Sequence, residues 1–119
     1  MGNVAYNPIS ALTRATLIDI VQCPETRALA VAIMSEAESV ARKLGIEIGV
    51  SIEQRLKGAE EVGHHKTSML QDIEAGKPTE LEAIVGAVIE LGEKLGLALP
   101  NTRSVYACVK LLEQQARHR

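Results

Sequence analysis

Apolar residues recur every three or four positions along most of this chain, which is the spacing of one face of an α-helix. The clearest stretch begins at Pro24, and proline is tolerated in a first helical turn because its missing amide would be unpaired there. The stripe continues through Leu29, Ile33, Ala37, Val40 and Leu44. Gly45 then follows a cationic last turn, an arrangement typical of a helix C-terminus. The pattern predicts a helix over residues 24–44.

Similar stretches indicate further helices in the rest of the chain. Ser51 begins a polar helix, and a short helix is expected over residues 68–74. Thr79 and Glu82 match a capping box, in which the Glu82 carboxylate would reach back to the Thr79 amide. Asn101 is expected to cap a last helix. No segment sustains the alternation of apolar and polar residues that indicates a strand in a sheet.

The core of such a fold must be aliphatic, because the chain has no Phe, no Trp and only 2 Tyr. Its 119 residues amount to one domain. We therefore expect an all-α fold, a compact bundle of about five or six helices that forms a single domain over residues 1–119.

The charge and composition also exclude several classes of partner. A net charge of −2 gives no basic field to hold nucleic acid, and the scarcity of aromatic side chains leaves no platform for stacked bases. No apolar run approaches the roughly 20 residues of a transmembrane helix, and the N-terminus lacks a signal-peptide pattern. Cys23 and Cys108 are too few for a disulfide framework and are expected to be buried free thiols of a cytoplasmic protein. We expect neither nucleic acid nor membrane as a partner.

Two polar features are candidates for a binding site. Asn3 and Asn7 lie four residues apart, so on a helix both amides point the same way, although such a pair more often caps or solvates a helix. The second feature is the run from Ser68 to Glu80, where a hydroxyl and carboxylates approach a helix N-terminus. Acidic residues are also expected there from the helix dipole alone. The residues by themselves leave the function open.

No motif indicates a metal site or a nucleophile. His64 and His65 are adjacent, so on a helix their side chains diverge, and a solvated helix end is the expected interpretation. The charge-rich stretch over residues 53–66 is expected to cover a solvated face.

Residues 68–72 read Ser-Met-Leu-Gln-Asp, and residues 76–80 read Gly-Lys-Pro-Thr-Glu. Residues 3–12 read Asn-Val-Ala-Tyr-Asn-Pro-Ile-Ser-Ala-Leu. These segments resemble signatures of the ketopantoate reductase (2-dehydropantoate 2-reductase) family, in which the first two are joined by a turn that leads into a helix. The likeness covers nearly the whole chain.

The resemblance implies an enzyme of two domains. In the family, a Rossmann-type N-terminal domain holds NADPH, and an all-α C-terminal domain of the 6-phosphogluconate dehydrogenase C-terminal-like kind closes the cleft. The reaction transfers hydride to 2-dehydropantoate and gives pantoate, on the route to pantothenate and coenzyme A. This sequence is similar to the second domain alone, so the dinucleotide-binding domain is expected to be absent from this chain.

The resemblance also assigns residues. It implies that Asn3 and Asn7 contact the substrate, that Ser68 binds the substrate carboxylate, and that Glu80 reaches the bound nucleotide. The family's catalytic lysine lies one helical turn before Asn3, and therefore before Met1. We expect no catalytic residue within the chain, and we expect the isolated 119 residues to be inactive.

Two hypotheses of different classes follow. The first is the C-terminal domain of a cytoplasmic NADPH-dependent 2-keto acid reductase, whose partners are the substrate, its own N-terminal domain and a second copy in a homodimer. The alternative is a free-standing helical interaction or dimerisation module without catalysis. A helical nucleic-acid binder is disfavoured by the acidic net charge.

Overall fold

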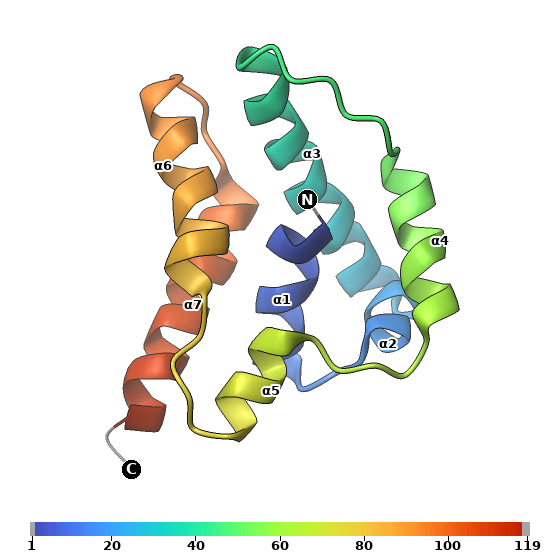
Figure 1. The fold of residues 1–119 in the computed structure, drawn as a ribbon, viewed down its shortest axis with the longest axis vertical. Coiled ribbons are helices and arrows are strands. Elements are labelled where there is room, and N and C mark those ends of the chain that lie inside the picture. The colour runs from blue at the N-terminus through green and yellow to red at the C-terminus, as the bar shows by residue number, and fades with distance from the viewer. Residues whose placement is uncertain (1, 118–119) are drawn as a thin grey trace.

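The first helix, α1 (Gly2–Thr13), runs through the middle of the fold (Figure 1). The computed structural model describes residues 2–117, and these contain helices but no strand. The other elements in chain order are α2 (Leu17–Gln22), α3 (Pro24–Lys43), α4 (Ile52–Val62), α5 (Ser68–Glu74), the π-helical segment η1 (Glu82–Gly86), α6 (Ala87–Lys94) and α7 (Pro100–Arg117). The prediction of an all-α bundle is confirmed, and the short helix α2 is the element that the sequence patterns did not indicate.

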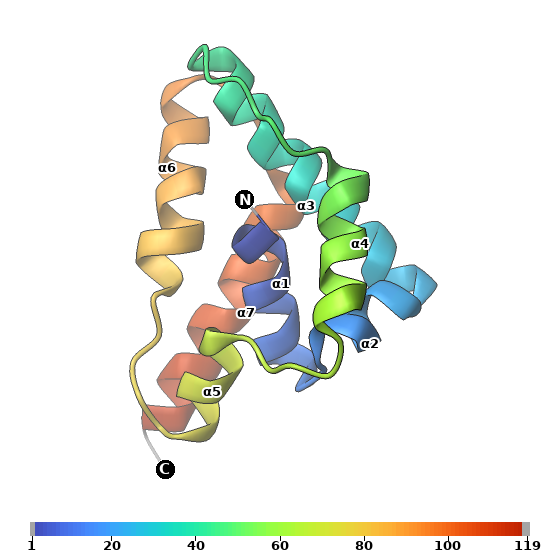
Figure 2. The ribbon, with the colours of Figure 1, turned by 45° about the vertical axis from the view of Figure 1, so that its right-hand side comes forward.

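Helix α1 is buried on nearly all sides. Every residue from Val4 to Ala11 is buried, because α3, α5 and α7 each pack against it. Figures 1 and 2 show these helices arranged around α1. A helix in this position supplies side chains to the core in every direction, and two of its polar residues, Asn7 and Ser10, are buried as well.

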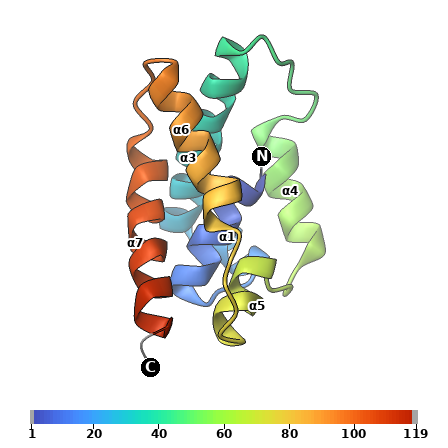
Figure 3. The same cartoon turned by 60° about the vertical axis from the view of Figure 1, so that its left-hand side comes forward.

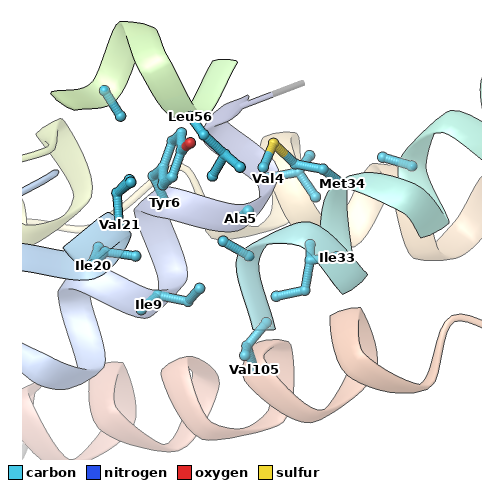
Figure 4. Close-up of a cluster of buried hydrophobic side chains, with 13 residues drawn as sticks. Val4, Ala5, Tyr6, Ile9, Ile20, Val21, Ile33, Met34, Leu56 and Val105 are labelled. Carbon is cyan, nitrogen blue, oxygen red and sulfur yellow. The ribbon is translucent and has the colours of Figure 1, made fainter. Parts of the chain in front are cut away.

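Two clusters of buried aliphatic side chains form the core. The larger one joins α1 to α2, α3, α4 and α7, and Tyr6 is its only aromatic member (Figure 4). The smaller one lies between α1, α5, η1, α6 and α7, and its members are Ala11, Met69, Ile73, Leu81, Val85, Ile89 and Val109. The expected stripe on α3 is confirmed at Ile33, Ala37 and Val40, but Leu44 lies past the end of the helix and is 45% exposed.

Helix α4 begins as predicted, since the Ser51 hydroxyl accepts a hydrogen bond from the Gln54 amide at 3.1 Å. The prediction of a capping box formed by Thr79 and Glu82 is wrong. The Thr79 amide donates instead to the carboxylate of Glu113 on α7, at 2.9 Å, and the Glu82 carboxylate accepts from the Tyr106 hydroxyl. The Thr79 hydroxyl accepts from the Leu81 amide at 3.2 Å, so Thr79 caps the next turn without the reciprocal bond from Glu82.

The prediction for Asn101 is also wrong, because it lies in the first turn of α7 rather than before it. The carboxylate of Glu36, on α3, accepts from the backbone amides of Asn101 and Thr102 at 3.1 and 2.9 Å. A side chain from a neighbouring helix therefore caps α7.

Both cysteines are free, as expected, but Cys23 and Cys108 are exposed rather than buried. Cys23 lies between α2 and α3, and Cys108 lies on the outer side of α7. Over residues 2–117, no helix combines the length and the apolar character needed to cross a membrane.

Candidate functional site

An unpaired donor in the interior marks the candidate site. Asn7 is only 3% exposed, yet its side-chain Nδ2 has no hydrogen-bond partner within residues 2–117. A buried polar group left without a partner destabilises a fold by about 1–3 kcal/mol. Asn7 lines a pocket of about 150 Å³, and this pocket is the candidate site.

This pocket, the head pocket, brings together three of the four predicted site residues. Asn7 of α1 lines it together with Ser68, Met69 and Asp72 of α5. Glu80, which precedes η1, and Ile84 of η1 complete the lining. Asn7, Ser68 and Glu80 therefore share one site although they lie far apart in the sequence.

A buried hydroxyl pair fixes α5 against α1 and so places Ser68. Thr67 caps α5 by accepting from the Leu70 amide at 3.2 Å. The Thr67 hydroxyl is also hydrogen-bonded to the hydroxyl of Ser10 on α1. Figures 1 and 3 show α5 lying across the end of α1 away from the N-terminus. Ser68, the first residue of α5, follows directly from this contact.

A second group of contacts holds η1, whose wide turn carries Ile84 to the pocket. Glu82 accepts from the Tyr106 hydroxyl, and the Lys110 ammonium lies 3.7 Å from the Glu82 carboxylate. The hydrogen bond to Glu82 raises the pKa of Tyr106 above its ordinary value, so the phenol remains a donor. π-Helical turns occur often at functional sites. Here the turn begins two residues after Glu80.

The head pocket is suited to a ligand that carries oxygen atoms of both kinds. Asn7 and Ser68 provide neutral donors for a carbonyl or carboxylate oxygen, and the carboxylates of Asp72 and Glu80 accept from hydroxyl groups. Met69 and Ile84 provide apolar contacts. Small-molecule sites commonly combine apolar walls with a few polar groups of this kind.

Asn3 does not share the head pocket. It is exposed and lines a neighbouring pocket of about 360 Å³, the distal pocket, whose lining is Gly2, Asn3, Tyr6, Leu17, Arg55, Gly58, Ala59 and Val62. Arg55 was missed by the sequence analysis, because the stretch 53–66 indicated a solvated face. The structure leaves Arg55 only partly exposed, whereas His64 and His65 are exposed as expected. The part of the chain that the structure describes holds no group of three His, Cys, Asp or Glu placed to bind a metal.

The chain is similar to known proteins over nearly its whole length. A family model described as "Ketopantoate reductase PanE/ApbA C terminal" matches residues 1–113. A 2-dehydropantoate 2-reductase from Mesorhizobium japonicum is 48% identical over 111 residues, which are 93% of this chain and 34% of that protein. The chain thus spans about a third of the length of this relative.

Solved structures of similar fold show the same partial coverage. A PanE/ApbA family ketopantoate reductase from Ralstonia eutropha superposes with a TM-score of 0.91 and 28% identity, over 98% of this chain and 40% of that one. A 2-dehydropantoate 2-reductase from Methylococcus capsulatus gives a TM-score of 0.88 and 37% identity, over 96% and 40% of the two chains.

Proposed function

The chain belongs to the ketopantoate reductase family, whose C-terminal model it matches over residues 1–113, and on this premise we propose that it forms the substrate-side wall of a two-domain reductase. The proposed reaction is the NADPH-dependent reduction of 2-dehydropantoate to pantoate, in the synthesis of pantothenate and coenzyme A. NADPH, when bound, supplies the hydride. The observation that carries the proposal is the unpaired Asn7 amide, buried in one pocket with Ser68 and Glu80.

The proposed roles follow from the chemistry of each side chain. The Asn7 amide donates to an oxygen of the keto acid, and the exposed Ser68 hydroxyl donates to its carboxylate. Neutral donors orient an anion without the strong retention that a buried charge pair gives. Asn3, one turn earlier on α1, contacts the part of the substrate that extends beyond the head pocket.

The exposed carboxylate of Glu80 fits the edge of a nucleotide, because it can accept from a ribose hydroxyl. Residues 2–117 contain no glycine-rich turn between a strand and a helix that would cradle a pyrophosphate. We therefore assign most of the NADPH contacts to a dinucleotide-binding domain outside this chain.

A ketone that becomes an alcohol also needs a proton donor at its oxygen. The family's lysine for this role precedes the residue matched by Asn3. We therefore expect the isolated 119 residues to leave NADPH unchanged in the presence of 2-dehydropantoate. The measurement is absorbance at the NADPH band over hours, and turnover would contradict this account of the site.

The site itself is tested by titrating the ¹⁵N-labelled chain with pantoate. We expect amide signals of residues 67–72 and 80–84 to move. Ser68→Ala should weaken binding about tenfold, since it removes one hydrogen bond to a charged group. The matched control is Ser35→Ala, which alters an exposed serine on α3 and should leave binding unchanged. Movement confined to other residues would contradict the proposal.

The two-domain organisation is tested by the mass of the native polypeptide in its source cells, detected with an antibody raised to this chain. A band longer by a dinucleotide-binding domain supports a reductase. A band of this chain's own mass favours the interaction module instead.

One observation supports that second candidate function. The connection between α3 and α4 exposes Leu44, Ile46 and Val50, which are 45%, 56% and 43% exposed. Neighbouring exposed apolar side chains are typical of a contact surface. If this segment pairs two copies of the chain, sedimentation equilibrium should show a dimer that Ile46→Glu dissociates. A monomer at high concentration would contradict the module.

A further inference from the structure

We propose that Ile84 is a specificity-determining residue of the head pocket, and that Tyr106 and Lys110 on α7 are positioning residues that hold it there. The inference deepens the proposed function and rests on it. In 2-dehydropantoate the third carbon, next to the ketone, carries two methyl groups. The roles proposed for Asn7 and Ser68 leave these methyl groups without a contact, and Ile84 supplies one.

The head pocket has two apolar side chains, and most of the apolar surface open to a ligand comes from Ile84. Met69 is only 1% exposed, since it belongs to the smaller core cluster. Ile84 is half-buried against both clusters and lines the pocket. A keto acid held by Asn7 and Ser68 has its third carbon one bond from the ketone carbon, so this carbon lies in the same pocket of about 150 Å³. We therefore assign its methyl groups to Ile84.

The backbone of η1 determines where Ile84 points. Isoleucine is branched at Cβ, so its χ1 angle is stiff and the side chain follows the backbone. The Ala87 amide donates to the Glu82 carbonyl oxygen five residues back, which is the hydrogen bond of a π-helical turn. Rewinding this turn as an α-helix would rotate Ile84 relative to α6 by about 100°, the angle between successive residues. The π-helical turn therefore keeps Ile84 at the pocket while α6 packs in the core.

Side chains of α7 hold this turn. The Tyr106 hydroxyl donates to the Glu82 carboxylate. The Lys110 ammonium lies 3.7 Å from that carboxylate and 5.6 Å from the centre of the Tyr106 ring. Glu82 and Ile84 are two residues apart, so their side chains do not face the same way. Segment η1, the yellow-orange start of the α6 ribbon in Figure 3, packs against both α1 and α7. The turn is thus fixed from α7, while Ile84 faces the pocket.

The chain leaves room for these contacts at Gly86. A Cβ at this position would lie 3.0 Å from a carboxylate oxygen of Glu82 and 3.5 Å from Cε1 of Tyr106. Glu82 could not move away from such a Cβ without loosening its contacts with Tyr106 and Lys110. The lack of a side chain at Gly86 therefore lets the Glu82 carboxylate reach α7.

The experiment compares pantoate with 2,4-dihydroxybutanoate of the same configuration, which lacks only the two methyl groups. Both acids are titrated into the ¹⁵N-labelled chain, and the dissociation constants are read from the amide shifts. We expect pantoate to bind about tenfold more tightly, because its methyl groups are buried. Ile84→Ala should lower this ratio to about twofold and Tyr106→Phe to about threefold. Ser104→Ala is the matched control, because it removes another exposed hydroxyl from α7 and should preserve the ratio.

The double variant Ile84→Ala/Tyr106→Phe tests whether Tyr106 acts through Ile84. If it does, the double variant has the same ratio as Ile84→Ala alone, since coupled residues are not additive. Lys110→Arg keeps a cation beside Glu82 and should preserve the ratio, whereas Lys110→Ala should lower it. Circular dichroism checks that each variant is folded, and Ile84→Val, a smaller change, should give a smaller drop in the ratio.

The other outcomes overturn the inference in distinguishable ways. A ratio unchanged by Ile84→Ala would assign the methyl groups to another residue. Equal weakening of both acids by Tyr106→Phe would show that the hydroxyl supports the whole pocket instead of Ile84. A further drop in the double variant would show that Tyr106 acts through another residue. Equal affinities in the parent chain, with shifts at residues 67–72 and 80–84, would remove the methyl contact and leave the proposed function intact. No shift of those residues with pantoate would contradict the proposed function itself.

Discussion

At the scale of single residues, Asn7 shows a conflict between stability and binding. Its amide is buried without a partner, so the ligand-free chain is less stable than it could be. Replacing an unpaired buried polar group with an apolar one of similar size removes that penalty. We expect Asn7→Leu to raise the free energy of unfolding by about 1–2 kcal/mol and to abolish pantoate binding.

Urea denaturation measures the first effect and the NMR titration measures the second. Asn3→Leu is the control, because Asn3 is exposed and its replacement should change stability by less than about 0.5 kcal/mol. A destabilised Asn7→Leu variant would show that the amide already has a partner in the ligand-free protein.

At the scale of elements, two glycines within helices should respond oppositely to the same change. A Cβ on Gly92 of α6 would lie 2.6 Å from Cδ1 of Leu99, whose side chain is buried and cannot swing into solvent. A Cβ on Gly58 of α4 meets nothing within 4 Å. We expect Gly92→Ala to destabilise the chain by about 1 kcal/mol, because overpacking exceeds the gain in helix propensity. Gly58→Ala should stabilise it by about 0.5–1 kcal/mol.

Thermal unfolding of the two variants, each against the parent chain, checks the signs. Stabilisation of both variants would mean that helix propensity alone decides both positions. Gly58→Ala also places a methyl group in the distal pocket, so its ligand affinity is informative as well.

The hydrogen bonds from the first turn of α7 to Glu36 on α3 predict that stability depends on pH. Burial raises the pKa of Glu36, but the hydrogen bonds from Thr102 and Asn101 outweigh it, and the pKa lies below its ordinary value of 4.5. A carboxylate of this kind stabilises the fold at pH values above its unfolded pKa, and the contribution is lost as pH falls through the lower folded value.

We therefore expect Glu36→Gln to be about 1–2 kcal/mol less stable than the parent at pH 7 and to converge with it in acid, below pH 4.5. Urea denaturation at several pH values measures this difference. Glu47→Gln, in an exposed connection, should follow the parent throughout. A difference that persists in acid would assign the effect to packing instead of charge.

The cap that Glu36 provides for α7 shows what the sequence could and could not predict. Helices and the Ser51 cap depend on neighbours in the sequence, so periodicity and cap residues predicted them. The caps supplied by Glu36 and Glu113 come from other helices, and local patterns carry no sign of them. The residues alone made Asn7 and the run from Ser68 to Glu80 two separate candidates, and the resemblance to a family then gave each residue a role. Arg55 was missed because its partial burial depends on how α4 packs against α1 and α2.

At the scale of the whole molecule, the scarcity of aromatic residues provides two separate reporters. Tyr6 belongs to the larger core cluster, and Tyr106 packs against the smaller one. Helix α1 contributes to both clusters, through Ile9 in the first and Ala11 in the second. A shared central helix should make the clusters unfold together, as in most small domains.

We expect the variants Tyr6→Phe and Tyr106→Phe, each with one remaining tyrosine, to show fluorescence transitions in urea that coincide with their own circular-dichroism transitions. Within either variant, a fluorescence midpoint apart from the circular-dichroism midpoint would show that the two halves of the core unfold separately. The parent chain, with both tyrosines, serves as the reference.

The position of α1 between two pockets has a consequence for how such proteins diversify. The wall that holds the head of a ligand is built from α1 and α5, which also supply core side chains such as Ile9 and Met69, so substitutions at those core positions disturb folding. The opposite wall, on α4, buries only Leu56 and Ala59. Substitutions at its other positions should change the free energy of unfolding only slightly. Descendants of one ancestral scaffold could therefore acquire new substrate ranges through α4 while inheriting the reactive end unchanged.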